Sequence, residues 1–195
     1  RVFRTSGTSE GASARGSPPL RTLATYEAAA LHSGQKLLLS DPRPTHAVLL
    51  TPSAGALPDS SLSFMVDLFT HELGIQAEHA IDASFGLSID GAIEALTRAE
   101  LSGEPTIVFG TAFAYVFLLD ALGEQRFRLG RGSRAMLTGG FKGRAREVPE
   151  NELRQRLSSM LGIPASRLVG EYGMTELSSQ LYEPRLAGEG VVDGT

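Results

Sequence analysis

PTIVFGTAFAYVFLLDALG (residues 105–123) places a short apolar run directly before a longer run that is apolar nearly all round. The first run is typical of a buried strand, because it is short, apolar and preceded by a proline. The second run is long enough for a helix and ends at a glycine, and its lack of a polar face indicates burial. This stretch therefore predicts a strand over 105–110 that leads into a buried helix over 111–123.

The same alternation continues on both sides of this stretch. Further strands are predicted at 46–50, 134–140 and 166–173, and further helices at 26–39, 61–74, 91–101 and 149–162. Strands that alternate with helices of this length indicate an α/β fold, with a largely parallel sheet and helices on both faces. In such folds, ligands bind in the crevice outside the carboxyl ends of the strands.

Two of these helices carry apolar residues on one face. The sets are Leu62, Val66, Phe69 and Leu73 in the first, and Leu153, Leu157, Met160 and Leu161 in the second. Each stripe has the spacing of an amphipathic helix that packs on a core.

The composition restricts the classes of function. The chain has 195 residues, is 42% hydrophobic and carries a net charge of −4, without the basic patch that is typical of nucleic-acid binders. It has no cysteine, which excludes disulfides, thiolate metal sites and a cysteine nucleophile. No apolar run approaches the roughly 18 residues of a membrane span, and no signal peptide is visible. A cytoplasmic protein is therefore expected, and the ends of the sequence favour a segment of a longer chain.

RTSGTSEGASARG (residues 4–16) is rich in glycine and hydroxyl residues, which suits a loop that binds phosphate through backbone N–H groups. A Walker A loop is excluded, because Ser17 stands where the lysine belongs after Gly11 and Gly16. A flexible surface loop without a ligand is the alternative interpretation of this segment taken alone.

The segment 7–11 also matches the G-x-S-x-G pattern of a hydrolase nucleophile, with Ser9 as the nucleophile. That pattern requires a helix directly after the serine, and the prolines at 18 and 19 argue against one. The partners of a triad would be Asp59 or Asp67 together with His71 or His79. A serine hydrolase is therefore kept as an alternative function.

Three motifs occur in order at the predicted strand ends: RTSGTSEG (4–11), LTGGFKGR (137–144) and EYGMTEL (171–177). The first resembles the phosphate loop of adenylate-forming enzymes, and the third resembles their Y-G-x-T-E motif. The second is similar to the strand end that these enzymes set against adenine. The order and spacing most resemble the acyl-protein synthetase (LuxE-like) branch, followed by the phenylacetate-CoA ligase type. The resemblance extends from Val2 to about Tyr182.

This resemblance implies that residues 1–195 form the ATP-binding portion of the large N-terminal domain of an adenylate-forming enzyme, without its C-terminal domain. The implied reaction is the ATP-dependent activation of a carboxylic acid, preferably a fatty acid, as an acyl adenylate. The acyl group would then pass to a thiol of a protein or CoA, or to another acceptor. The implied cofactors are ATP and Mg²⁺. The segment alone is expected to be incomplete for turnover, since the catalytic lysine of the family lies in the C-terminal domain.

The resemblance also implies roles for individual residues. Those expected to hold the β- and γ-phosphates are Thr5, Ser6, Gly7, Thr8 and Ser9. Gly139 and Gly140 would let the backbone approach adenine, and Tyr172 would stack on the ring. Thr175 would contact the α-phosphate, and Glu176 would bind Mg²⁺, so these two are the expected catalytic residues.

Other interpretations of these residues remain open. Tyr172 is also compatible with a core aromatic at a strand end, and Glu176 with a cap of a following helix. Glu10 departs from the family pattern, which has glycine at that position. Either its side chain points away from the phosphates, or the loop has an insertion. The stretch 109–117 is the expected apolar wall for the acyl group, with a buried core helix as the alternative. A non-catalytic nucleotide-binding α/β module is a further alternative function.

Overall fold

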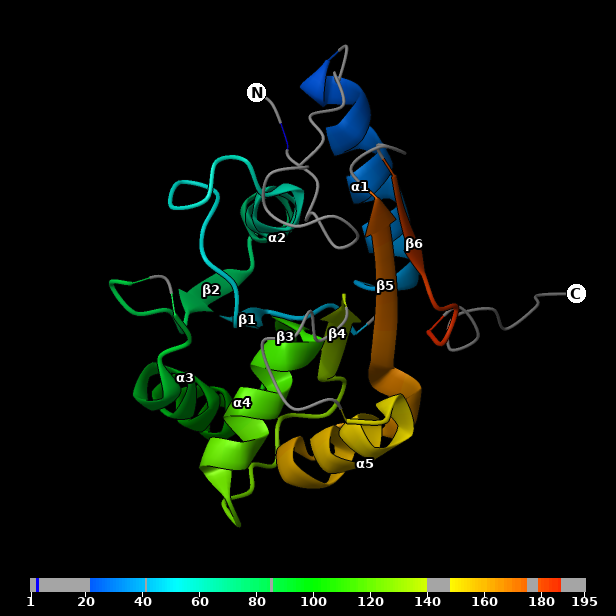
Figure 1. Ribbon diagram of the computed structural model, residues 1–195. Coiled ribbons are helices and arrows are strands. Elements are labelled where there is room, and N and C mark those ends of the chain that lie inside the picture. Colours follow the sequence, from blue (N-terminus) through cyan, green and yellow to red (C-terminus); the bar gives the residue numbers. More distant parts are fainter. Residues whose placement is uncertain are drawn as a thin grey trace, which may run out of the picture.

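The computed structural model describes residues 3, 22–40, 42–84, 86–139, 148–174 and 179–186, apart from the side chains of residues 174 and 179 (Figure 1). The elements in chain order are α1 (Leu23–Leu37), β1 (His46–Leu49), α2 (Ser61–Glu72), β2 (Gln76–His79), α3 (Ile89–Ser102), β3 (Thr106–Thr111), α4 (Ala112–Leu122), β4 (Arg134–Thr138), α5 (Glu150–Leu161), the 3₁₀ turn η2 (Ala165–Arg167), β5 (Leu168–Met174) and β6 (Ser179–Tyr182).

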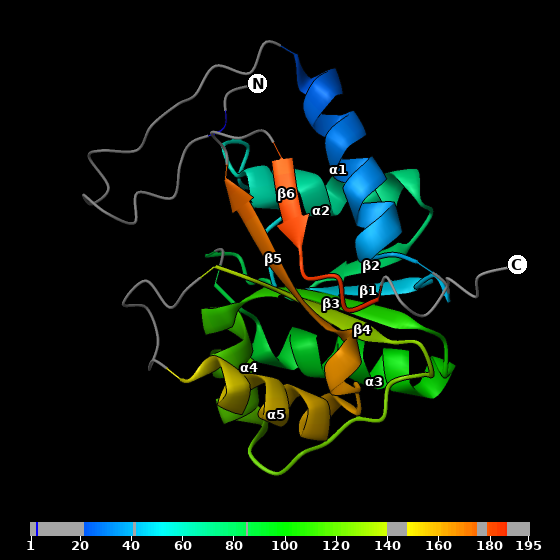
Figure 2. The ribbon, with the colours of Figure 1, turned by 90° about the vertical axis from the view of Figure 1, so that its right-hand side faces the viewer.

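The strands of the described residues form one sheet in the order β2-β1-β3-β4-β5-β6. The strands from β1 to β5 pair in parallel, and β6 pairs with β5 in antiparallel orientation. Helices α1 and α2 cover one face of the sheet, while α3, α4 and α5 cover the other (Figure 2). The predicted α/β class, with a largely parallel sheet and helices on both faces, is confirmed.

Each face of the sheet has its own apolar core. Side chains alternate between the two faces along a strand, so neighbouring residues belong to different cores. Val48 and Val108 pack with α3, α4 and α5, whereas Leu49 and Phe109 pack with α1 and α2. Strands that are buried on both faces have continuous apolar runs rather than alternating ones, which explains the sequences of β1 and β3.

Two buried polar side chains, Tyr115 and Arg134, donate hydrogen bonds to main-chain carbonyl oxygens in and around the sheet. The hydroxyl of Tyr115 in α4 is shared between the carbonyl oxygens of Val108, at 2.8 Å, and Met136, at 3.0 Å. The guanidinium of Arg134, at the start of β4, is fully buried. It donates to main-chain carbonyl oxygens of the segment after α1 and of the turn before β4, namely those of Leu38, Ser40, Pro42 and Gly132.

The predicted helices and strands are present, with bounds that differ by a few residues. The residues that form the two predicted apolar stripes are buried or pack on the cores. Strands β2 and β6 were not expected from the sequence, and η2 replaces the start of the strand predicted over 166–173. The strand predicted over 134–140 ends at Thr138, because Gly139 turns the backbone to a φ of 67°.

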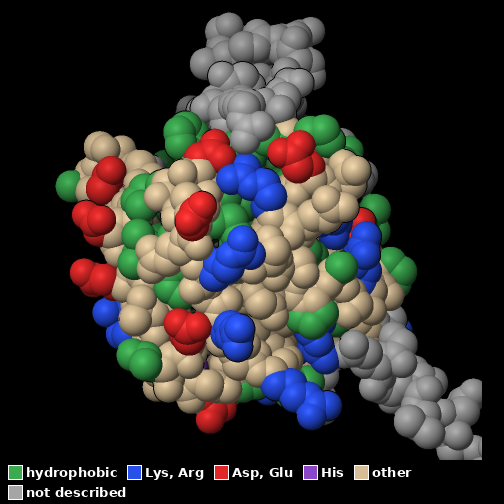
Figure 3. Space-filling view, turned by 90° about the horizontal axis from the view of Figure 1, so that it is seen from below, with side chains coloured by type: hydrophobic (Ala, Val, Ile, Leu, Met, Phe, Trp, Pro, Cys, Tyr) green, Lys and Arg blue, Asp and Glu red, His purple; other side chains and the backbone are tan. Residues whose placement is uncertain are grey.

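The surface carries charges of both signs. On the face that Figure 3 shows, Lys and Arg side chains are interspersed with Asp and Glu side chains. Within the described ranges, none of the helices combines the length and the apolar character that crossing a lipid bilayer requires.

Candidate functional site

A cavity of about 640 Å³ opens at the carboxyl ends of β4 and β5. It is lined by the end of β4, by β5 and β6, and by the first turns of α5. Of the site residues expected from the motifs, Gly139 and Tyr172 are described, and both line this cavity. The remaining expected residues lie outside the described residues: Thr5, Ser6, Gly7, Thr8, Ser9, Gly140, Thr175 and Glu176.

Gly139 presents bare backbone to the cavity. Its φ of 67° lies in the left-handed region, which side chains rarely adopt, and a Cβ at this position would stand in open space. The conformation therefore favours glycine here, and it leaves the main chain accessible to a flat ligand.

Tyr172, on the neighbouring strand β5, lines the same cavity. Its side chain is 61% exposed, so its interpretation as a core aromatic is wrong. Its cross-strand partner on β6 is Leu181, which is equally exposed and lines the same cavity. An exposed aromatic ring and bare backbone that line one cavity suit a planar ring system.

The floor of this cavity is held by an ionic network around Glu183. Its carboxylate accepts hydrogen bonds from Arg154 Nη2 at 2.8 Å, from Arg185 Nε at 2.7 Å and from the backbone N–H of Gly170 at 2.9 Å. Burial alone would raise the pKa of Glu183, but these hydrogen bonds and the charge of Arg154 outweigh it and lower the pKa. The network ties α5 to the end of β6.

A second, smaller cavity of about 60 Å³ lies on the other face of β5, beneath α1 and α2. It is lined by Glu171 and Gly173, whereas Tyr172 between them lines the larger cavity. Thr138 and Glu171 line both cavities, so the two cavities adjoin the same residues at the ends of β4 and β5.

Glu171 is an ionisable group inside the protein, with 8% of its surface exposed. Burial raises the pKa of its carboxyl group, and the hydrogen bond from the hydroxyl of Thr138 offsets only part of this effect. A Cβ at residue 173 would collide with Oε1 of Glu171, so Gly173 makes room for this carboxyl group. Burial, followed by the charge of Glu171, also raises the pKa of the Tyr26 hydroxyl.

Sequence reasoning missed Glu171, Gln180 and Glu183, which line these cavities. Charged and amide residues are normally exposed, so the apolar pattern carried no sign of their burial. The available signal was position, since Glu171 immediately precedes the tyrosine of the EYGMTEL motif.

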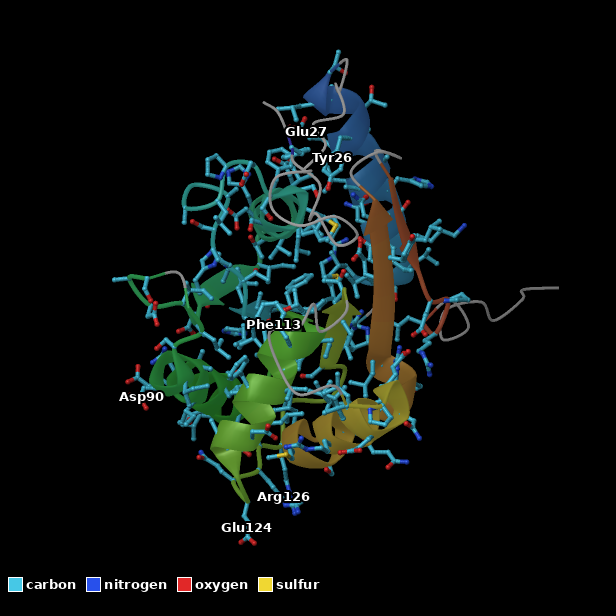
Figure 4. All side chains as sticks on the ribbon, in the orientation of Figure 1. Tyr26, Glu27, Asp90, Phe113, Glu124 and Arg126 are labelled. Atoms are coloured by element: carbon cyan, nitrogen blue, oxygen red, sulfur yellow. The ribbon has the colours of Figure 1, made fainter. Side chains whose placement is uncertain are left out.

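The stretch 109–117, expected to form an acyl wall, is mostly core. Phe109 and Tyr115 are fully buried, and Phe113 packs against the core at the start of α4, where Figure 4 labels it. Ala112 contributes to the lining of the larger cavity, and no residue of the stretch lines the smaller one among the described residues.

Two histidines are candidates for the hydrolase base, His71 and His79. His71 Nδ1 lies 3.1 Å from Oε1 of Glu72 rather than beside an expected aspartate. His79 Nδ1 lies 2.9 Å from the carbonyl oxygen of Thr51, and its Nε2 lies 3.6 Å from Oδ1 of Asp67. A triad histidine needs one ring nitrogen facing the aspartate and the other facing the serine. Here the second nitrogen faces a main-chain carbonyl, which argues against a triad through this pair.

No group of three or more potential metal-binding side chains occurs within the described part of the chain. Glu176, the expected Mg²⁺ ligand, lies outside it.

In comparisons with known proteins, no protein-family model matches the chain, and no curated protein matches its sequence. Several solved structures share its fold, and two of them are ATP-bound. The ATP-bound RpMatB-BxBclM chimera B1 superposes with a TM-score of 0.63 at 13% identity, and ATP-bound MatB from Rhodopseudomonas palustris with 0.57 at 15% identity. Both matches cover 94% of this chain, which spans 30% and 31% of the lengths of those proteins. The α/β fold of this chain is thus the fold of part of MatB.

Proposed function

We propose that this chain is the ATP-binding portion of an adenylate-forming ligase. The observation that carries the proposal is that Gly139 and Tyr172, expected from two separate motifs, line one cavity at the carboxyl ends of neighbouring strands. The volume of about 640 Å³ falls in the range of small-molecule sites. The shared fold of two ATP-bound structures supports the same nucleotide.

In the proposed reaction, a carboxylate oxygen of the acid attacks the α-phosphorus of ATP. The bond from this phosphorus to the bridging oxygen breaks, and pyrophosphate leaves with the electron pair. Negative charge builds on the phosphate oxygens, so hydrogen-bond donors aimed at them lower the barrier. We assign this role to Thr175 at the α-phosphate and to the loop of residues 5–9 at the β- and γ-phosphates.

The remaining roles are assigned from the motif resemblance, and the lining of the cavity by Gly139 and Tyr172 supports two of them. Tyr172 stacks on the adenine ring, and Gly139 with Gly140 provides the opposite backbone wall. Glu176 supplies one carboxylate ligand for Mg²⁺, which would neutralise phosphate charge when bound. A fatty acid as substrate, and a protein thiol or CoA as acceptor, remain finer parts of the proposal that rest on the motif resemblance.

ATP–Mg²⁺ binding, measured by isothermal titration calorimetry, tests this function. Stacking of a base on an aromatic side chain is worth about 1–3 kcal/mol, so Tyr172→Ala should weaken binding roughly five- to 150-fold. Because the ring is 61% exposed, its removal should leave the fold intact. Tyr172→Phe keeps the stacking surface and should bind nearly as well as the unchanged chain. Glu176→Ala should weaken binding in the presence of Mg²⁺.

A control variant separates these effects from a general loss of surface hydrophobicity. Leu101→Ala removes a side chain that is 81% exposed on α3, and it should leave ATP binding unchanged. Unchanged binding in both Tyr172→Ala and Glu176→Ala would reject the nucleotide site. A folded chain that binds no ATP but reacts with a fluorophosphonate, and loses this reaction in Ser9→Ala, would favour the hydrolase instead.

A further inference from the structure

The smaller cavity contains more hydrogen-bond acceptors than donors. Gln180 is 7% exposed, and its Oε1 is buried without a hydrogen-bond partner among the described residues. The Tyr26 hydroxyl donates its proton to the carbonyl oxygen of Ser61 at 3.1 Å, which leaves its lone pairs toward the cavity side chains. The carboxyl group of Glu171 adds further acceptor oxygens.

Two of the side-chain donors that line this cavity are already used by neighbouring side chains. The Thr138 hydroxyl hydrogen-bonds to Glu171, and the Gln180 side chain hydrogen-bonds to the Tyr26 hydroxyl. An unpartnered buried oxygen costs about 1–3 kcal/mol, so Oε1 of Gln180 should be retained only where a ligand or water satisfies it. The unpartnered Oε1 of Gln180 therefore calls for a group that donates a hydrogen bond.

The size of the cavity limits that group. One water molecule needs at least about 10–15 Å³ of such space, so about 60 Å³ holds roughly four or five atoms of that size. This is room for a short polar end, and it is too small for a fatty acyl chain. Met65 and Leu62 complete the wall with apolar surface.

The position of the cavity connects it to the proposed chemistry. It shares Thr138 and Glu171 with the larger cavity, so a molecule that reaches a nucleotide from the α1–α2 side of the sheet would extend into it. This step rests on the proposed function, which places an ATP in the larger cavity and requires an acid beside it.

We propose that the smaller cavity binds the far end of the acid substrate, and that this acid is short and carries a hydrogen-bond donor, a hydroxyl or an ammonium group. Oε1 of Gln180 and the carboxyl group of Glu171 accept from this donor. These two residues are therefore specificity determinants. The substrate that we propose is thus a short acid with a hydrogen-bond donor, and not the fatty acid that the sequence resemblance implies.

Three acids of matched length test the inference: β-alanine, β-hydroxypropionate and butyrate. They differ only in their terminal ammonium, hydroxyl or methyl group, and octanoate serves as the fatty probe. Binding of each acid is measured by calorimetry in the presence of Mg²⁺ and a non-hydrolysable ATP analogue. Hydrogen bonds to charged groups are worth about 1.5–3 kcal/mol, so at least one donor-bearing acid should bind roughly tenfold or more tightly than butyrate.

Two substitutions locate the preference and identify the donor. Gln180→Leu removes the unpartnered oxygen at similar volume and should abolish most of the preference over butyrate. Glu171→Gln replaces a carboxyl group that can ionise beside a bound cation by a neutral amide that keeps an acceptor, so it should weaken β-alanine more than β-hydroxypropionate if the natural donor is an ammonium group. An equal effect on both acids would identify a hydroxyl.

Glu124→Gln is the matched control for the charge change. Figure 4 shows Glu124 at the opposite end of the molecule from Tyr26, which lines the smaller cavity. This variant should keep the preference of the unchanged chain. Circular dichroism and thermal unfolding establish that each variant is folded, and either cavity variant that folds decides the question.

The inference is overturned if butyrate or octanoate binds as tightly as the donor-bearing acids, or if the preference survives both cavity substitutions. ATP binding, measured on the same samples, separates this result from the proposed function. A chain that binds ATP but prefers butyrate overturns the inference alone. A donor preference that depends on Gln180 in a chain without ATP binding supports the cavity chemistry and rejects the ligase.

Discussion

Replacing Glu171 by glutamine should stabilise the folded chain, and the gain should grow with pH. The carboxyl group is 8% exposed, and burial raises its pKa above the ordinary value of 4.5, while the Thr138 hydroxyl compensates only in part. Above pH 4.5 the unfolded chain releases this proton while the folded chain still holds it. Unfolding then releases a proton, so rising pH lowers the free energy of unfolding until the folded pKa is passed.

The magnitude follows from the size of the shift. Each unit by which the folded pKa exceeds the unfolded one costs about 1.4 kcal/mol at high pH. For a chain of this length, 1 kcal/mol changes the melting temperature by about 2–4 °C, which gives roughly 3–6 °C per unit. The Glu171→Gln variant has no carboxyl group at this position and avoids this cost. Its melting temperature should therefore exceed that of the unchanged chain by this amount at high pH.

Thermal unfolding at a series of pH values from about 4 to 8 measures this difference. Both proteins share every other carboxyl group, so the difference isolates residue 171. Glu124→Gln, which removes an exposed carboxylate, should show a much smaller trend. If the difference in melting temperature between Glu171→Gln and the unchanged chain stays constant or falls as the pH rises, burial of the Glu171 carboxyl group does not destabilise the fold and the reasoning is refuted.

The remaining predictions concern the core and are measured by denaturant unfolding. Tyr115→Phe removes a buried hydroxyl that two strand carbonyls share, and should cost about 1–3 kcal/mol; no loss would mean that the hydroxyl is not used. Arg134→Met leaves several buried carbonyls unsatisfied and should cost about 3–5 kcal/mol, and full retention of stability would contradict this. Gly34→Ala brings a Cβ to 2.5 Å from Cζ of Phe69. The overpacking should cost about 1–3 kcal/mol, which is more than the free energy gained from the higher helix propensity of alanine. A net gain in stability would show that the ring of Phe69 moves freely.

The central strands and the helices could be predicted because burial on both faces leaves a plain apolar pattern. The edge strands could not. β2 reads QAEH and is mostly exposed, so it has no apolar run. In β6 the usual pattern is inverted, because Gln180 is buried and the apolar Leu181 is exposed. Both residues line cavities, and pairing with β5 rather than intrinsic preference holds them in a strand.

The candidate site was predicted in part for a similar reason. Gly139 and Tyr172 were found through motifs, which describe a local arrangement of backbone and ring. The buried Glu171 depends on α1, α2 and β6 closing over it, and these contacts join residues that lie far apart in the sequence. No local pattern records such an enclosure. The motif residues outside the described ranges remain predictions.

The strand β5 carries Glu171 and Tyr172 as neighbours, and of these two only Glu171 lines the smaller cavity, whereas both line the larger one. Because consecutive residues of a strand point to opposite faces, the smaller cavity can be altered at position 171 without a change at position 172. An engineer could retune one specificity at position 171 while leaving the stacking ring at 172 in place. Inserting or deleting a single residue ahead of this pair would affect both positions at once. Each side chain would move to the other face of the sheet, and the ring of Tyr172 would point inward. This part of the chain should therefore tolerate changes of side chain far better than changes of length.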